Sequence, residues 1–289
     1  MARNDDVPFP RLEPPRSAGV LRKWMEALAA QQGTTRDRIQ WTLAFELVIA
    51  ALNPANESPM FLVKGGHALE LRVPDLARAT RDLDAMSADI VDVHEIEREV
   101  RARLAAPRCD GAVVFEVREA HLDEAVGFVR FDVRVRFLND PLKKVKLEIS
   151  AVEGAAGAQW DPVKAIGMAQ TFGLTDGVID EIPCLSIPYQ IAQKIHAVTA
   201  PSEGNDRFRD LIDIILLDEI SDGDVSQLRR ACLEIFTLRS QHPWPPTVEI
   251  RDGWEDGFRD MANHIAFPIN DVHAAAAFVQ ERVNAIDVA

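Results

Sequence analysis

The chain has 289 residues, of which 47% are hydrophobic and 27% charged, and this is the composition of an ordinary globular protein. A chain of this length buries a large core, and we expect it to divide into two lobes. The formal net charge of −14 excludes binding of nucleic acid through the bulk charge of the protein, so any such contact needs a local basic patch.

The cysteines and the apolar runs favour one cellular compartment. The three cysteines (Cys109, Cys184 and Cys232) are widely scattered, which indicates free thiols in a reducing environment. No apolar run approaches the roughly 18 residues that a membrane span needs. Residues 1–17 are polar and proline-rich, without the apolar segment of a secretion signal. We therefore expect a cytoplasmic protein with no membrane contact.

The first hundred or so residues predict helices around one strand–helix–strand unit. A helix is expected over 17–32, with Ser17 as its N-cap, and a second over 35–52. In the unit over 60–86, a short apolar strand stops at two glycines, a short helix follows, and a second strand carries Asp-x-Asp. The pattern at 91–104 is that of an amphipathic helix.

Three strand-like runs follow, at 112–118, 127–138 and 144–151, and the middle one alternates strictly between apolar and polar residues. After a loop at 153–159 the pattern becomes mostly helical to the end. The sequence thus predicts an α+β protein, with a mixed α/β lobe at 1–185 and a helical lobe at 186–289.

Asp82 and Asp84 are the most informative residues of the chain. Because residues i and i+2 of a strand point to the same face, their carboxylates lie side by side. Two like charges at that separation repel each other unless a cation sits between them. Oxygen-rich sites of this kind suit Mg²⁺, which also takes phosphate oxygens. The pair therefore predicts a site for phosphoryl or nucleotidyl transfer.

A strand, Gly-Gly, a helix and then Asp-x-Asp is the pattern of the polymerase-β-like nucleotidyltransferases. KGGHALELR at 64–72 followed by RATRDLD at 78–84 resembles the AbiEii subgroup, to which the MenT toxins belong. AQKIHAV at 192–198 followed by RFRDLIDI at 207–214 resembles a second signature of the same subgroup. The resemblance covers roughly residues 60–217, and it implies a polymerase-β-like core followed by a helical C-terminal lobe.

The first signature implies residues for the nucleotide and the metal. Gly65 and Gly66 let the backbone approach a triphosphate, and the start of the following helix favours its anionic oxygens. The other nucleotide-binding candidates are Lys64, Arg78 and Arg81, although the two arginines could simply balance the carboxylates. His67, where the wider superfamily often has a small polar residue, is expected to be a packed side chain rather than a phosphate ligand.

The resemblance also implies a third acid on a neighbouring strand, which completes the metal site and helps to deprotonate the attacking hydroxyl. Glu148 is our candidate, with Asp132 on the preceding strand as the alternative and a plain solvent-facing role for Glu148 also open. The expected cofactor is Mg²⁺ or Mn²⁺, held by Asp82, Asp84 and Glu148, and the expected substrate is an NTP.

The second signature implies that Lys194 neutralises the triphosphate, that Asp210 is the favoured partner of this lysine, and that Asp213 belongs to the nucleotide-binding residues. Asp210 and Asp213 share a helix face at i, i+3 spacing. A lysine beside a buried stripe can also extend its ammonium group to solvent, which is the structural alternative. The sequence has three candidate basic patches for RNA, each of which can also be a plain solvated surface: Lys143, Lys144 and Lys146; Arg207 and Arg209; Arg229, Arg230 and Arg239.

Taken with the resemblance, these residues predict an enzyme that transfers a nucleoside monophosphate from an NTP to an acceptor hydroxyl. In the family the acceptor can be the 3′ end of tRNA, which blocks translation, and a cognate antitoxin protein is implied as partner. Three alternatives stay open: a protein or small-molecule acceptor, a kinase-like phosphotransferase, and a catalytically decayed interaction protein. The presence of the glycines, both aspartates, Lys194 and Asp210 argues against decay.

Overall fold

The computed structural model describes residues 9–74, 76, 80–174, 179–201 and 206–289. Arg78, a predicted nucleotide-binding residue, lies outside the described residues. The chain forms two compact units. The first comprises Met1–Val63, Ala79–Val152 and Pro162–Cys184, and the second Lys64–Arg78, Glu153–Asp161 and Leu185–Ala289. The predicted domains, 1–185 and 186–289, are a simpler division of the chain and stay a prediction.

The N-terminal helices form where the sequence predicts them. Ser17 Oγ accepts a hydrogen bond from the N–H of Val20 at 3.2 Å, and Thr35 Oγ1 caps the next helix in the same way. The helices of the first unit are α1 (Ala18–Gln31), α2 (Arg36–Leu52), α4 (Val93–Ala105) and the short α5 (Met168–Thr171). The predictions over 17–32, 35–52 and 91–104 are thereby confirmed.

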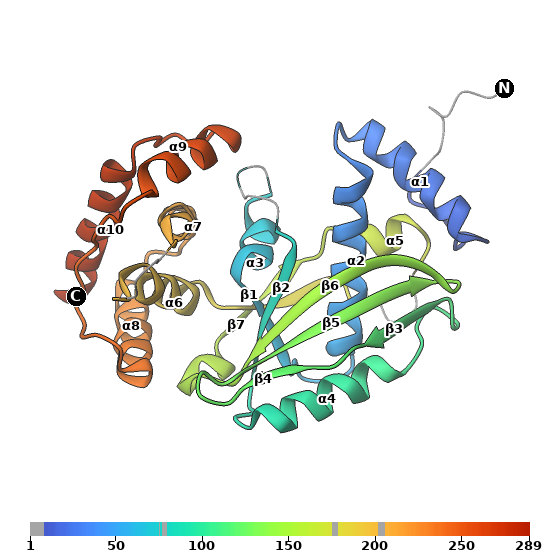
Figure 1. Ribbon diagram of the computed structural model, residues 1–289, viewed down its shortest axis with the longest axis horizontal. Helices are drawn as coiled ribbons and strands as arrows, with labels where there is room; N and C mark the ends of the chain where they lie inside the picture. Colours follow the sequence, from blue (N-terminus) through green and yellow to red (C-terminus); the bar gives the residue numbers. More distant parts are fainter. Residues whose placement is uncertain (1–8, 75, 77–79, 175–178, 202–205) are drawn as a thin grey trace. The chain divides into compact units, whose positions relative to one another are not determined.

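One eight-stranded mixed sheet is the centre of the fold (Figure 1). Its order is β3-β5-β6-β2-β1-β8-β7, and β4 pairs with β5. The β2–β6 and β1–β8 pairs are parallel, whereas β3–β5, β4–β5 and β5–β6 are antiparallel. The strands are β1 (Phe61–Lys64), β2 (Asp82–Ser87), β3 (Val113–Val117), β4 (His121–Asp123), β5 (Phe128–Phe137), β6 (Asp140–Ser150), β7 (Trp160–Lys164) and β8 (Glu181–Leu185).

The sequence reading missed β4, β7 and β8, and the chain does not turn helical directly after residue 159. Strand β8 lies between β1 and β7 and is buried at four consecutive positions without polar alternation, so its five residues show no strand period. β7 contains Pro162, which is tolerated there because β7 is an edge strand. Both strands are completed by neighbours distant in sequence.

The two faces of the β3-β5-β6 part of the sheet differ sharply. Val129, Phe131 and Val133 of β5 are fully buried, and α2 and α4, which touch each other, pack against these strands (Figure 1). The alternate residues of β5 and β6 are charged and at least partly exposed. We call this second side the charged face. Strand alternation therefore sorts the core from the charged side chains.

The second unit is mostly helical. Its elements are α3 (Gly65–Arg72), the 3₁₀ helix η2 (Gly154–Ala158), α6 (Ile187–Thr199), α7 (Phe208–Glu219), α8 (Val225–Arg239), α9 (Trp254–His264) and α10 (Val272–Asp287). α6 packs against α7 and α8 through the predicted stripe of Ile191, Ile195 and Val198, and α3 touches α7. In the described part of the chain, no helix has the length and apolarity to cross a membrane.

Candidate active site

Asp82 and Asp84 lie on the same side of β2, with the buried Leu83 between them. Asp82 is exposed and Asp84 half-buried. The turn into the strand is fixed by Thr80, whose hydroxyl donates to the carbonyl of Asp82 at 3.1 Å. The predicted side-by-side placement of the two carboxylates is therefore present in the fold.

Glu148 lies directly beside this pair. In the parallel β2–β6 ladder its register partner is Asp84, and neighbouring strands are about 4.8 Å apart. Its Oε2 accepts hydrogen bonds from Arg130 Nε at 3.1 Å and Nη2 at 2.6 Å. These bonds, and the charge of the carboxylate, raise the pKa of the Arg130 guanidinium. Glu148 is thus a surface-facing carboxylate that is already bound by a cation.

The alternative third acid, Asp132, lies one strand farther from β2. It is on β5, and its carboxylate pairs with Lys144 of β6 at 2.7 Å. The sheet order therefore places Glu148, and not Asp132, on the strand next to the Asp-x-Asp pair. Sequence alone left this choice open because both residues alternate with apolar neighbours.

The donor atoms of the three carboxylates are of the type that a hard divalent cation binds. Asp82, Asp84 and Glu148 supply only oxygen atoms, which Mg²⁺ and Mn²⁺ prefer. Within the described residues, however, no three acidic, histidine or cysteine side chains are already gathered tightly enough to hold a metal. Glu148 would have to exchange Arg130 for the ion, whereas Asp82 is exposed and accessible.

Lys194, Asp210 and Asp213 form a second, buried cluster between α6 and α7. Lys194 Nζ donates to Asp210 Oδ1 at 2.9 Å and to Asp213 Oδ2 at 2.6 Å. Burial by itself lowers the pKa of Lys194, but the two carboxylates outweigh it and raise the pKa. The Lys194 side chain is only 11% exposed and its ammonium group is held by the two carboxylates, so it does not extend to solvent. Both aspartates are its partners, which corrects the preference for Asp210.

One oxygen of this cluster is left over. Asp210 Oδ2 is buried and has no hydrogen-bond donor among the described residues, and Arg207 Nη1 approaches it only to 3.7 Å. A buried acceptor without a donor is costly, and such atoms are enriched where a ligand or water completes the site. Asp210 Oδ2 can therefore accept a hydrogen bond from one more donor besides Lys194.

The glycine pair begins helix α3 directly after β1. Gly65 has a φ of +65°, which a residue with a β-carbon rarely adopts, so glycine is required there. His67 is 1% exposed, and its Nδ1 lies 3.4 Å from Glu70 Oε2. The prediction of a packed histidine is confirmed. Arg81, by contrast, is exposed, and its charge helps to lower the pKa of Asp37.

Glu153 is a charged residue that sequence reasoning passed over. It follows β6 and accepts hydrogen bonds from Arg239 at 2.7 and 3.0 Å and from the Gln193 side-chain amide. Burial would raise its pKa, but Arg239 above all, with a contribution from Lys64, holds the pKa below its usual value. Its partners lie 40 and 86 residues away. No local motif could have indicated the contact.

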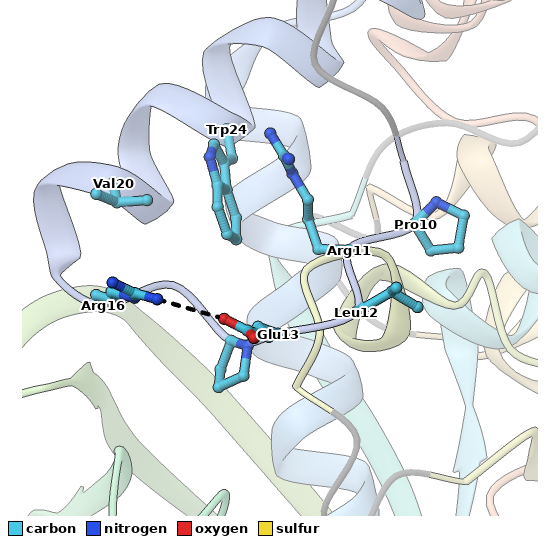
Figure 2. Close-up of a pocket in the computed structure, with 8 residues that line it drawn as sticks. Pro10, Arg11, Leu12, Glu13, Arg16, Val20 and Trp24 are labelled. Atoms are coloured by element: carbon cyan, nitrogen blue, oxygen red, sulfur yellow. Dashed lines mark ion pairs between the residues drawn. The ribbon is translucent and has the colours of Figure 1, made fainter.

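A pocket of about 500 Å³ lies elsewhere, between the segment before α1 and α1 itself (Figure 2). The guanidinium of Arg11 stacks on the ring of Trp24 there, 4.4 Å from its centre, and Arg16 pairs with Glu13 at 3.5 Å. Of the described residues that line it, none was predicted as a site residue. The pocket therefore adds nothing to the carboxylate site.

Comparisons with known proteins identify the family of the chain and a similar fold. The sequence matches the family described as nucleotidyl transferase AbiEii toxin, type IV toxin–antitoxin system, over residues 47–281. Among solved structures, the fold is similar to MenT4, a nucleotidyltransferase toxin from Mycobacterium tuberculosis H37Rv. That match has a TM-score of 0.59, 16% sequence identity, and covers 92% of this chain and 89% of the other.

A weaker likeness is to an antigenic nucleotidyltransferase-like protein from Paracoccidioides brasiliensis. Its TM-score is 0.41 at 12% identity, covering 70% of this chain and 89% of that one. No curated protein matches the sequence.

The family match over most of the chain identifies a nucleotidyltransferase, and its mixed α and β fold is similar to that of MenT4. The chain belongs to the AbiEii nucleotidyltransferase toxin family of type IV toxin–antitoxin systems. As in nucleotidyltransferases generally, an NTP is the donor substrate, and membership of a toxin–antitoxin family implies an antitoxin partner.

Proposed function

We propose that this protein is a metal-dependent toxin that transfers a nucleoside monophosphate from an NTP to a hydroxyl at the 3′ end of tRNA. The acceptor oxygen attacks the α-phosphorus, the bond from that phosphorus to the bridging oxygen breaks, and pyrophosphate leaves. Capping the 3′ end prevents aminoacylation and so blocks translation. The cognate antitoxin restrains this activity.

One observation carries the proposal: Asp84 of β2 and Glu148 of β6 are register partners, with Asp82 on the same face. In this assignment Asp82 and Asp84 would hold Mg²⁺ or Mn²⁺, which would supply positive charge to stabilise the reacting phosphate oxygens. Once Arg130 has released the Glu148 carboxylate, Glu148 takes the proton of the acceptor hydroxyl. The exposed position of Asp82 leaves the carboxylates open to both substrates.

The other predicted site residues serve the nucleotide in this proposal. Gly65 and Gly66 offer backbone N–H groups at the start of α3, and Lys64 contributes positive charge. Lys194 stabilises the negative charge that develops on pyrophosphate. Asp210 and Asp213 hold the ammonium group of Lys194 in place and keep it charged. Arg78 and Arg81 remain proposed phosphate contacts.

The experiment incubates the purified protein with total tRNA, Mg²⁺ and each α-³²P NTP in turn. The same reactions are run with Asp82→Asn and Asp84→Asn, and with Glu116→Gln as a control. Glu116 is a similarly exposed carboxylate of the sheet that pairs with Arg136 on β3–β5, away from β2. We expect label on tRNA from the wild type and the control, and none from the two aspartate variants.

The outcomes separate the remaining reactions. Label from γ-³²P nucleotide instead of α-³²P would show a phosphotransferase. Absence of label on tRNA with every nucleotide would overturn the tRNA proposal and leave a protein or small molecule as acceptor. Equal labelling by wild type and both aspartate variants would remove catalysis from Asp82 and Asp84.

A further inference from the structure

The charged face of the sheet carries more basic than acidic side chains, although the protein as a whole is acidic. The chain has a net charge of −14, yet the outward positions of the adjacent strands β5 and β6 carry five basic residues against two acidic ones (Asp132 and Glu148): Arg130, Arg134, Arg136, Lys144 and Lys146. Arg118 directly follows β3, and its N–H donates to the carbonyl of Asp132, so it continues the same ladder. The face is therefore a local basic surface.

Some of these cations are neutralised and some are not. Arg130 is bound by Glu148, Arg136 by Glu116, and Lys144 by Asp132. In contrast, three exposed side chains, those of Lys146, Arg134 and Arg118, form no ion pair with any carboxylate in the part of the chain that the structure describes. Unneutralised cations on an acidic protein attract a polyanion locally.

The three unneutralised cations lie in order across the sheet. Lys146 on β6 is the register partner of Asp82 on β2, so it begins beside the proposed catalytic carboxylates. Arg134 lies on β5, the next strand, opposite Lys144. Arg118 lies at the end of β3, the edge strand. We call Lys146, Arg134 and Arg118 the cationic track.

We propose that the cationic track binds the phosphate backbone of the acceptor nucleic acid, leading from the reacting 3′ end at Asp82 to the edge of the sheet at Arg118. The inference rests on the proposed transfer to RNA, and it adds which surface holds that substrate. Phosphates are the anions that arginine and lysine side chains on an open surface bind best, and such contacts position a strand without reading its sequence. The track therefore sets affinity for the acceptor and leaves NTP binding unchanged.

The test measures binding of fluorescently labelled total tRNA by anisotropy, without nucleotide, over a series of KCl concentrations. The variant is Arg118→Gln/Arg134→Gln, which removes two exposed cations distant from Asp82, and Lys146→Gln is measured separately. The matched control is Arg22→Gln/Lys23→Gln, two exposed cations of α1. Each lost phosphate contact reduces the slope of log K against log salt by about 1, so we expect the double variant to lose about 2.

Transfer is then measured with the same proteins. We expect the double variant to raise KM for tRNA about tenfold or more while KM for the NTP stays within about twofold, because each phosphate contact is one of several. If the double variant had the same salt slope and the same affinity for tRNA as the control variant, the proposed role of the cationic track would be wrong. If no NMP transfer to tRNA occurs in the wild type, the proposed function fails, and the binding slopes still decide whether the track holds a nucleic acid.

Discussion

Asp84 on β2 and Glu148 on β6 occupy the same level of two neighbouring parallel strands. They are 64 residues apart in sequence, and the parallel ladder alone brings them together. Arg130 binds Glu148 in this arrangement, so the third carboxylate is held by a cation on the same face as the Asp-x-Asp pair. A metal ion bound by Glu148 would therefore have to displace the guanidinium group of Arg130.

This relationship makes Glu148→Gln a test of the third acid. Because an amide cannot accept the proton of the attacking hydroxyl and binds Mg²⁺ poorly, we expect kcat to fall about 10²–10⁴-fold. Binding of tRNA should stay unchanged. The comparison is Asp132→Asn, one strand farther out, which should stay within a few-fold of wild type. A larger loss for Asp132→Asn than for Glu148→Gln would transfer the role to Asp132.

Lys194 should be essential for stability as well as activity. Lys194→Met removes the ammonium group that pairs with the two buried carboxylates of Asp210 and Asp213, which costs about 3–5 kcal/mol of unfolding free energy. Urea unfolding measures the loss. The variant Lys194→Met/Asp210→Asn/Asp213→Asn has no buried charge and should recover much of it. If Lys194→Met alone unfolds like wild type, the three residues are not coupled.

The same cluster predicts alkaline sensitivity. The pKa of Lys194 is raised above its ordinary value of 10.5 because its two carboxylate partners outweigh burial. A raised lysine pKa stabilises the fold fully below pH 10.5, and that stabilisation is lost as pH rises through the folded-state pKa. Unfolding free energy measured above pH 10.5 should therefore fall more for wild type than for the triple variant. If the unfolding free energies of the two proteins fell in parallel with pH, Lys194 would make no pH-dependent contribution to stability.

His196 should make the protein sensitive to acid. Burial first, and then the charges of Arg239 and His242, lower the pKa of His196 from 6.5 to about 4. The unfolded chain takes up its proton at a higher pH than the folded one, so stability is present above pH 6.5 and is lost as pH falls toward about 4. The full effect is up to about 3 kcal/mol.

The variant that isolates this effect is His196→Phe. The ring of His196 packs edge-on against Phe236, its Nε2 has no hydrogen-bond partner among the described residues, and its Nδ1 has only a 3.5 Å contact with Arg239 Nη1. An apolar ring of similar shape therefore keeps the packing and loses that one contact. Unfolding free energy of the variant should change less than that of wild type between pH 6.5 and about 4. The reverse order would contradict the assignment.

Gly154→Ala should be more damaging than an alanine at another glycine with a similar backbone. Gly154 has a φ of +55°, and a β-carbon there would overlap the carboxylate of Glu234, which accepts hydrogen bonds from the Ala155 N–H and the Tyr189 hydroxyl. We expect a loss of about 2–4 kcal/mol, from backbone strain and overpacking together.

Gly223→Ala is the matched control, because Gly223 has a φ of +79° and a β-carbon there meets nothing within 4 Å. Only the backbone strain of about 1–2 kcal/mol remains in that variant. Thermal unfolding of both proteins gives the difference. Equal losses would mean that the Glu234 carboxylate moves aside without cost.

Local chemistry made much of this fold readable in advance. Capping residues such as Ser17 and Thr35 act on N–H groups within three residues, so helix starts are visible in the sequence. The alternation of β5 likewise reflects one buried and one charged face. Short strands such as β8 gave no signal, because five residues buried by distant partners have no period of their own.

The same division holds for the candidate site. The sequence by itself determined that Asp82 and Asp84 share one side of a strand, since Asp-x-Asp on a strand puts two carboxylates on one side wherever that strand lies. Only the tertiary structure decided that Glu148 rather than Asp132 stands next to them, and that Lys194 contacts both Asp210 and Asp213. The reason is physical: a strand's neighbours and a buried charge's partners are set by packing between distant segments, which local patterns do not encode.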